Sequence, residues 1–68
     1  MLEEKWLNQR VGTVYTYWET RVAPEHLFDK CVKRTMEMIR QYREGEDPEQ
    51  YRAYIEQRVR RLMGEQEG

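Results

Sequence analysis

The feature that most constrains this chain is a long segment, residues 24–44, in which apolar and polar side chains separate at helical spacing. At about 100° per residue, one arc of the helical wheel collects nearly all the apolar side chains and one threonine: Leu27, Phe28, Cys31, Val32, Thr35, Met36, Met38, Ile39 and Tyr42. Pro24 suits the first turn of a helix, and Gly45 supplies a stop. The pattern predicts an amphipathic helix from Pro24 to Glu44.

The width of this apolar arc shows how many neighbours the helix needs. The arc spans about half the helix circumference, whereas a surface helix needs roughly 100°. Such a helix must pack against at least two other elements, and a chain of 68 residues has little material for both. We therefore expect part of the cover to come from another molecule, so that the domain is oligomeric or bound to a partner.

A further helix follows a short connection. Asp47-Pro48-Glu49 is a typical helix start, because Asp47 can accept hydrogen bonds from free backbone amides and Pro48 has no amide hydrogen to leave unpaired. Gly64 predicts the end, giving a helix over 48–63 and a frayed tail over 65–68. Short connections usually join antiparallel neighbours, so residues 24–63 are predicted to form a helical hairpin.

The N-terminal third is ambiguous. Many residues between Val11 and Val22 are β-branched or aromatic, and such residues favour strands. The spacing fits a helix better, because one narrow stripe at helical period holds Leu7, Val11, Val14, Trp18 and Val22. We expect a helix over about 2–22, ended by the break that Pro24 imposes on the residue before it. The sequence thus predicts an all-α fold: one small domain over 1–68, with three helices built on an antiparallel helical hairpin.

Composition narrows the classes of function. Charged residues make up 37% of the chain, with 12 Lys and Arg against 13 Asp and Glu, which argues against a nucleic-acid binder driven by electrostatics. No apolar run approaches the roughly 20 residues that span a bilayer. The single cysteine excludes an intramolecular disulfide, so we expect a reducing, cytoplasmic location.

The sequence offers weak candidates for catalysis or metal binding. Cys31 and His26 are the only residues of their kinds, but the helical wheel places Cys31 on the apolar arc and His26 on the polar one. Glu25, His26 and Asp29 are adjacent acidic and imidazole groups without a spaced ligand pair elsewhere. We expect no enzyme activity, no cofactor and no metal site.

The sequence contains two groups of basic residues on its predicted helices. One lies on the polar side of the central helix and the other near the end of the last helix: Lys30, Lys33 and Arg34, and Arg58, Arg60 and Arg61. Such groups usually only solvate a helix face. Phosphate binding would require both groups on one surface beside a stacking aromatic residue such as Tyr17 or Trp6.

The preferred functional interpretation is a small accessory or adaptor subunit that self-associates or docks on a larger protein through its apolar helix face. Aromatic residues and methionine are enriched at such surfaces. The residues predicted to make the contact are Trp18, Leu27, Phe28, Val32, Met36, Ile39 and Tyr42.

The alternative hypothesis is that residues 13–20 form a strand, as their strand propensity favours. A strand followed by two helices resembles the order of ribbon-helix-helix DNA-binding regulators. That resemblance implies a dimer whose paired strands would read the major groove with one alternate set of side chains. Neither set in this segment is basic.

Overall fold

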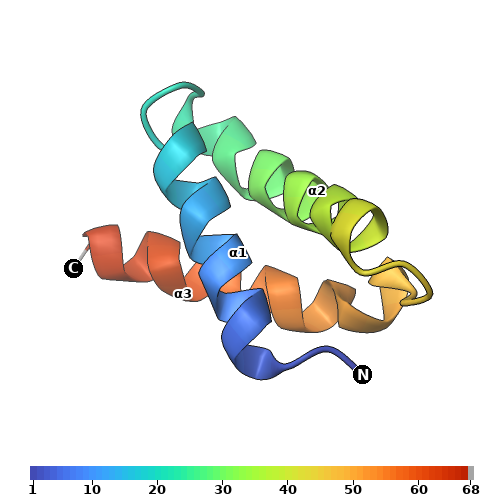
Figure 1. The fold of residues 1–68 in the computed structure, drawn as a ribbon. Helices are drawn as coiled ribbons and strands as arrows, with labels where there is room; N and C mark the ends of the chain where they lie inside the picture. Colours follow the sequence, from blue (N-terminus) through green and yellow to red (C-terminus); the bar gives the residue numbers. More distant parts are fainter. Residues whose placement is uncertain (68) are drawn as a thin grey trace.

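The computed structural model describes residues 1–67 and shows three α-helices joined by short connections (Figure 1). The helices are α1 (Glu4–Trp18), α2 (Pro24–Tyr42) and α3 (Arg52–Glu67), with a 3-10 turn, η1 (Pro48–Tyr51), before α3. α1 and α2 pack side by side in opposite directions, and α3 crosses behind α1. No strand occurs among the described residues, so the predicted all-α class of three helices is confirmed.

The N-terminal third is helical, and the strand considered for residues 13–20 is wrong, because α1 extends to Trp18 and a turn follows. Leu7, Val11 and Val14 are buried along one side of α1. A stripe that buries apolar area on successive turns outweighs the modest preference of β-branched residues for strands.

α1 is shorter at both ends than the expected range 2–22. At its start, the side chain of Leu2 is buried and its backbone N–H donates to the Tyr51 hydroxyl at 3.1 Å, which ties the first residues to η1 instead of to the helix axis. At its end, Ala23 is extended, with φ −64° and ψ 150°, as the residue before Pro24 prefers to be. The chain therefore uses residues 19–23 to turn into α2.

The predicted helix signals around the second connection are confirmed. α2 begins at Pro24 and ends shortly before Glu44. Gly45 then takes a φ of 94°, a left-handed conformation that glycine adopts without steric cost. The next helix starts with the expected cap, in which the Asp47 carboxylate accepts from the Glu49 backbone N–H at 3.1 Å.

The predicted end of the last helix at Gly64 is wrong. α3 continues to Glu67, so residues 65–67 of the expected frayed tail are helical, while residue 68 lies outside the described part of the chain. Gly64 does not adopt a positive φ. A glycine inside a helix costs only about 1 kcal/mol, and the Glu and Gln residues that follow are good helix formers.

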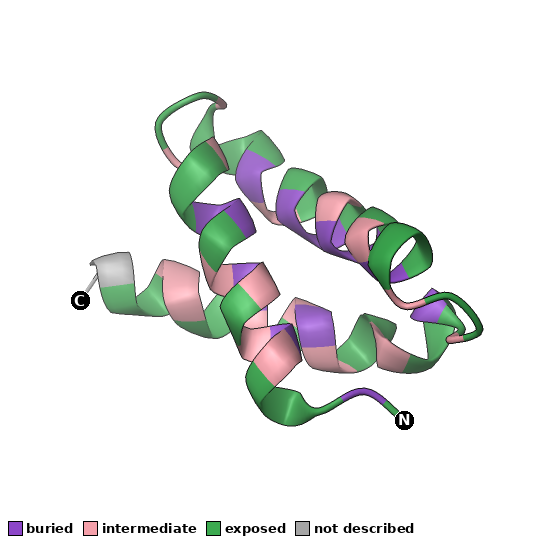
Figure 2. Cartoon of the chain, viewed as in Figure 1, coloured by how far each residue is buried: buried purple, intermediate pink, exposed green. Residues whose placement is uncertain are grey.

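The three helices enclose one core, to which α2 contributes most. Its buried side chains are Leu27, Cys31, Val32, Thr35, Met36 and Ile39. Figure 2 shows these buried positions along the side of α2 that faces α1 and α3. The wide apolar arc does need two neighbours, as predicted, and both belong to the same chain.

Candidate functional site

Four of the seven predicted interface residues lie in the core rather than on the surface. Their exposed fractions are small, at 6% for Leu27, 3% for Val32, 8% for Met36 and 0% for Ile39. α1 and α3 pack on neighbouring parts of the arc, so each hides a share that the sequence pattern had left for another molecule. The prediction that these four side chains form a docking surface is therefore corrected: they stabilise the fold.

The other three predicted interface residues remain at least partly exposed. Tyr42 is 64% exposed at the end of α2. Phe28 is half-buried, with the guanidinium carbon of Arg60 at 4.8 Å from its ring centroid. Trp18 lines a hollow between α1 and α2.

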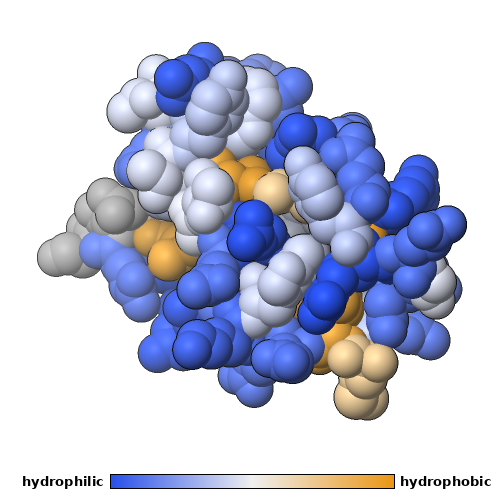
Figure 3. Space-filling model, viewed as in Figure 1, coloured by the Kyte–Doolittle hydropathy of each residue, from blue (hydrophilic) through white to orange (hydrophobic). Residues whose placement is uncertain are grey.

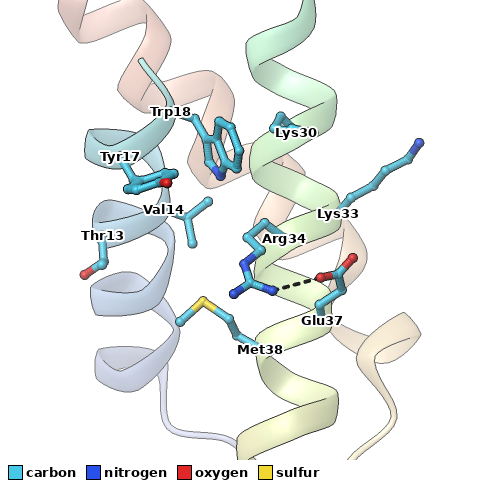
Figure 4. Close-up of a pocket in the computed structure, with 9 residues that line it drawn as sticks. All are labelled: Thr13, Val14, Tyr17, Trp18, Lys30, Lys33, Arg34, Glu37 and Met38. Atoms are coloured by element: carbon cyan, nitrogen blue, oxygen red, sulfur yellow. Dashed lines mark hydrogen bonds and ion pairs between the residues drawn. The ribbon is translucent and has the colours of Figure 1, made fainter. Parts of the chain in front are cut away.

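This hollow has a volume of about 550 Å³ and is the candidate site; we call it the α1–α2 groove. Its lining residues are Thr13, Val14, Tyr17, Trp18, Lys30, Lys33, Arg34, Glu37 and Met38. Figure 4 shows Val14 and Trp18 from α1 and Met38 from α2 pointing into the space between the helices. In Figure 3, apolar side chains reach the surface between α1 and α2 with hydrophilic side chains around them.

Helical spacing places these side chains opposite one another. Val14 and Trp18 are four residues apart on α1, and Lys30, Arg34 and Met38 follow the same step on α2. Residues four apart lie above one another on a helix surface, so each set forms a row along its helix. The two rows face each other across the groove, and the apolar members form its floor.

The cations of the groove differ in how they are neutralised. Arg34 pairs with Glu37 at 2.9 Å, and Lys33 pairs with Asp29 at 3.1 Å while its side chain extends away from the groove (Figure 4). Lys30 forms no ion pair among the described residues. Its ammonium nitrogen instead lies 4.8 Å from the ring centroid of Trp18. The charge of Lys30 is therefore available to a carboxylate from outside.

The aromatic wall of the groove is made by Tyr17 and Trp18. Their ring centroids are 4.8 Å apart with an interplanar angle of 82°, an edge-to-face arrangement. The guanidinium carbon of Arg21 lies 3.9 Å from the Tyr17 ring centroid, and Arg21 also donates to the Tyr17 carbonyl at 2.6 Å. Each ring thus carries a cation against it.

A related cluster lies where α1 begins and α2 ends. The guanidinium carbons of Arg10 and Arg43 lie 5.4 Å and 5.1 Å from the ring centroid of Trp6. Neither arginine forms an ion pair with a carboxylate among the described residues, and the Nε of each is buried without a hydrogen-bond acceptor there. The charge of Arg43 also acts on the Glu46 carboxylate and helps to lower its pKa, so the positive charge of this cluster is partly compensated within the chain.

Cation–aromatic contacts recur in this chain. The described residues contain five of them, with distances from 3.9 Å to 5.4 Å between the cation and the ring centroid. Two of the pairs, Trp6–Arg10 and Tyr17–Arg21, carry a sequence signal, because their residues are four apart on one helix. The other three join residues far apart in the sequence, and no local pattern predicts them.

The structure does not bring the candidate catalytic residues together. Cys31 is fully buried, and burial raises the pKa of its thiol to about 11. The His26 side chain is 73% exposed, with its Nε2 3.7 Å from a Glu25 oxygen. Within residues 1–67, no group of three or more His, Cys, Asp or Glu side chains is arranged to hold a metal ion.

The two basic groups of the sequence do not share a surface. Arg61 on α3 pairs with Glu65 at 3.6 Å, and Arg60 covers Phe28. Phe28 and Lys30 are two positions apart on α2, which places them about 200° apart around the helix. The condition for phosphate binding by both groups together is not met.

The comparisons with known proteins give no information on function. No model of a known protein family matches the sequence, and no curated protein or solved structure matches it either. Within the described part of the chain, no helix is long and apolar enough to cross a membrane. The α1–α2 groove and the charges around it are therefore the features that bear on function.

Proposed function

We propose that this chain is a non-catalytic interaction domain that binds an acidic segment of another protein in the α1–α2 groove. The observation that carries the proposal is an apolar floor beside Lys30, a cation with no carboxylate partner among the described residues. An apolar side chain of the partner would displace water from Trp18 and Met38, which are both partly exposed. A neighbouring carboxylate would pair with Lys30, and this charge would select acidic partners.

A protein partner fits the groove better than a nucleic acid does. The net charge of the chain is −1, so the chain lacks the basic excess that is usual for nucleic-acid binders driven by electrostatics. Single-stranded nucleic acids bind by stacking bases on open aromatic faces. Tyr17 and Trp18 instead carry Arg21 and Lys30 against their rings, which leaves the groove better suited to carboxylates and apolar side chains.

In this role the chain acts as an accessory or adaptor subunit. The proposed docking surface is the groove side of α2, not its buried arc. The cytoplasm is the proposed location, because the single cysteine is a free thiol. A second copy of the chain is the competing occupant of the groove.

The first test measures binding of a synthetic peptide in which two leucines are flanked by glutamates. The matched control peptide has glutamine at each glutamate position. Fluorescence of the Trp6→Phe variant reports the groove alone, because Trp18 is then the only tryptophan. We expect the glutamate peptide to bind more tightly than the glutamine peptide, and the difference to shrink as salt screens the charges.

Charge reversal then tests the residue that carries the proposal. Lys30→Glu should weaken binding of the glutamate peptide about tenfold, since it replaces an attraction with a repulsion worth about 1.4 kcal/mol. Arg61→Glu makes the same charge change on α3 and should leave binding unchanged. Equal affinity for both peptides would sink the proposal. So would tighter binding of a twelve-nucleotide thymidine strand, or self-association that covers Trp18.

A further inference from the structure

The α1–α2 groove contains a second cation that faces the proposed binding segment. Arg34 comes four residues after Lys30, so the two side chains lie above one another on α2, about 6 Å apart along the helix axis. Both line the groove. Figure 4 shows the guanidinium of Arg34 in the space between α1 and α2, near Met38. A segment that lies in the groove along α2 therefore meets both cations.

Arg34 differs from Lys30 because a carboxylate of the chain already pairs with it. The guanidinium donates one hydrogen bond to Glu37, at 2.9 Å, and the two side chains are 43% and 56% exposed. The pair of Glu49 and Arg52, also three residues apart, instead has two hydrogen bonds, at 2.9 Å and 3.0 Å. An exposed pair with a single hydrogen bond is worth little, because water screens it and both long side chains lose freedom. Glu37 therefore holds Arg34 loosely.

The same carboxylate also opposes an acidic partner. Glu37 lines the groove, so its negative charge repels a carboxylate that enters. A guanidinium has several N–H donors, of which Glu37 uses one among the described residues, and it can bind a carboxylate through two parallel hydrogen bonds. A carboxylate of the partner can thus replace Glu37 at Arg34, and the exposed side chain of Glu37 can then turn into solvent.

Because the chain is proposed to bind an acidic segment in this groove, we propose further that Glu37 masks Arg34 against segments with one carboxylate, and that the occupant carries two. The first carboxylate pairs with Lys30, and the second displaces Glu37 from Arg34. Glu37 thus acts as an internal competitor. A lone carboxylate finds only Lys30 unpaired, whereas two neighbouring carboxylates gain both cations. Arg34 and Glu37 together determine this specificity.

The decisive experiment uses the unmodified chain and three peptides of equal length, titrated by calorimetry. Each peptide contains two leucines. One peptide carries a glutamate on both sides of them, and the others carry a glutamate on one side and a glutamine on the other. We expect the peptide with two glutamates to bind about fivefold more tightly than either peptide with one, a ratio equivalent to about 1 kcal/mol. Nuclear magnetic resonance should show a larger shift of the Arg34 Nε–H signal with the two-glutamate peptide than with the others.

Two substitutions test whether Arg34 provides the second contact. Arg34→Gln should remove the advantage of the two-glutamate peptide, because only Lys30 is then left to pair. Lys33→Gln makes the same charge change at a side chain that extends away from the groove, so the advantage should remain (Figure 4). Circular dichroism establishes that each variant is folded, and the peptide comparison on the unmodified chain needs no variant.

Removing the competitor should have the opposite effect. Glu37→Gln should raise the affinity of the two-glutamate peptide about fivefold, because Arg34 is then unpaired before the peptide arrives. The matched control is Asp29→Asn, which also removes a carboxylate from an ion pair on α2, but from a pair whose cation, Lys33, extends away from the groove. This control should change the affinity by less than about twofold, as expected for a screened charge.

The possible failures separate the two proposals. Should the three peptides bind equally, or should Glu37→Gln raise the affinity no more than Asp29→Asn does, the masking of Arg34 is wrong. The proposed function still holds in that case if Lys30→Glu weakens binding. Should none of the peptides bind the unmodified chain, both proposals fail.

Discussion

The two sides of α2 differ in how they treat apolar surface. The inner side carries no charged residue in its buried set, and α1 and α3 exclude water from it. The groove side mixes Met38 with Lys30 and Arg34, and its apolar atoms stay partly open to solvent. Burial on the inner side stabilises the fold, while on the groove side cations cover aromatic faces and keep charge that a partner can use. One amphipathic helix thus stabilises the fold with one side and presents a candidate site on another.

The largest effect should be a difference in stability loss between two substitutions at neighbouring positions, one on the inner side of α2 and one on the groove side. Ile39 is fully buried, so Ile39→Ala should cost about 2–5 kcal/mol of the free energy of unfolding. A core of this size supplies only about 3–5 kcal/mol, so this variant should be largely unfolded at 25 °C. Met38→Ala, one residue away on the groove side, should cost about 1 kcal/mol or less. Urea denaturation followed by circular dichroism measures both, and equal losses would break the distinction between the sides.

A smaller effect should come from the one buried polar residue of the inner side. Thr35 is fully buried, and its hydroxyl has no hydrogen-bond partner among the described residues. Thr35→Val keeps the shape and removes the unsatisfied hydroxyl, so it should raise the free energy of unfolding by about 1 kcal/mol. The control is Thr13→Val in the exposed wall of the groove, for which we expect little change in the same urea measurement. A loss of stability in Thr35→Val would mean that the hydroxyl is bonded after all.

The smallest effect concerns a charged cluster beyond the end of α2, away from both sides. The Tyr51 hydroxyl donates to Glu46 at 2.6 Å, and the Met1 amine lies 3.0 Å from the other oxygen; together they lower the pKa of the Glu46 carboxyl below its ordinary value of 4.5. A lowered pKa in the folded state contributes stability above the unfolded pKa, and this contribution is lost as pH falls through the folded value. Glu46→Gln should therefore be slightly less stable at pH 7.

That small difference should vanish at acid pH. Thermal melts of the Glu46→Gln variant and the unmodified chain should converge once the pH is well below 4.5. Glu44→Gln is the matched control, because Glu44 is exposed and forms no ion pair among the described residues. A difference that persists at low pH would show that the substitution acts through packing rather than through the carboxylate charge.

Several parts of the fold could be predicted because their signals are local. Pro24 and Asp47 act through their own backbone or through a hydrogen bond two residues away, and Gly45 marks a helix end because it takes a φ of 94°. The stripe from Leu7 to Trp18 identified a helix despite its β-branched residues. The predicted helix end at Gly64 was wrong because Gly64 does not take a positive φ, and the helix continues through it to Glu67.

The candidate site was predicted much less well. Among the residues predicted to contact a partner, only Trp18 lines the groove. Met38 was recognised as apolar, but the sequence assigned it to the same arc as Ile39, since neighbouring positions differ by only about 100° around the helix. The contacts of Lys30 with Trp18 and of Arg43 with Trp6 join residues far apart in the sequence.

The sequence by itself determined that this chain forms three helices and that its central helix needs cover over half its circumference. The tertiary structure decided what supplies that cover, which side of α2 stays open, and which cations meet which rings. The physical reason is that helical periodicity follows from local backbone geometry, whereas burial depends on how whole helices cross. A repeating pattern records how much apolar surface must be hidden, and the packing of α1 and α3 determines what hides it.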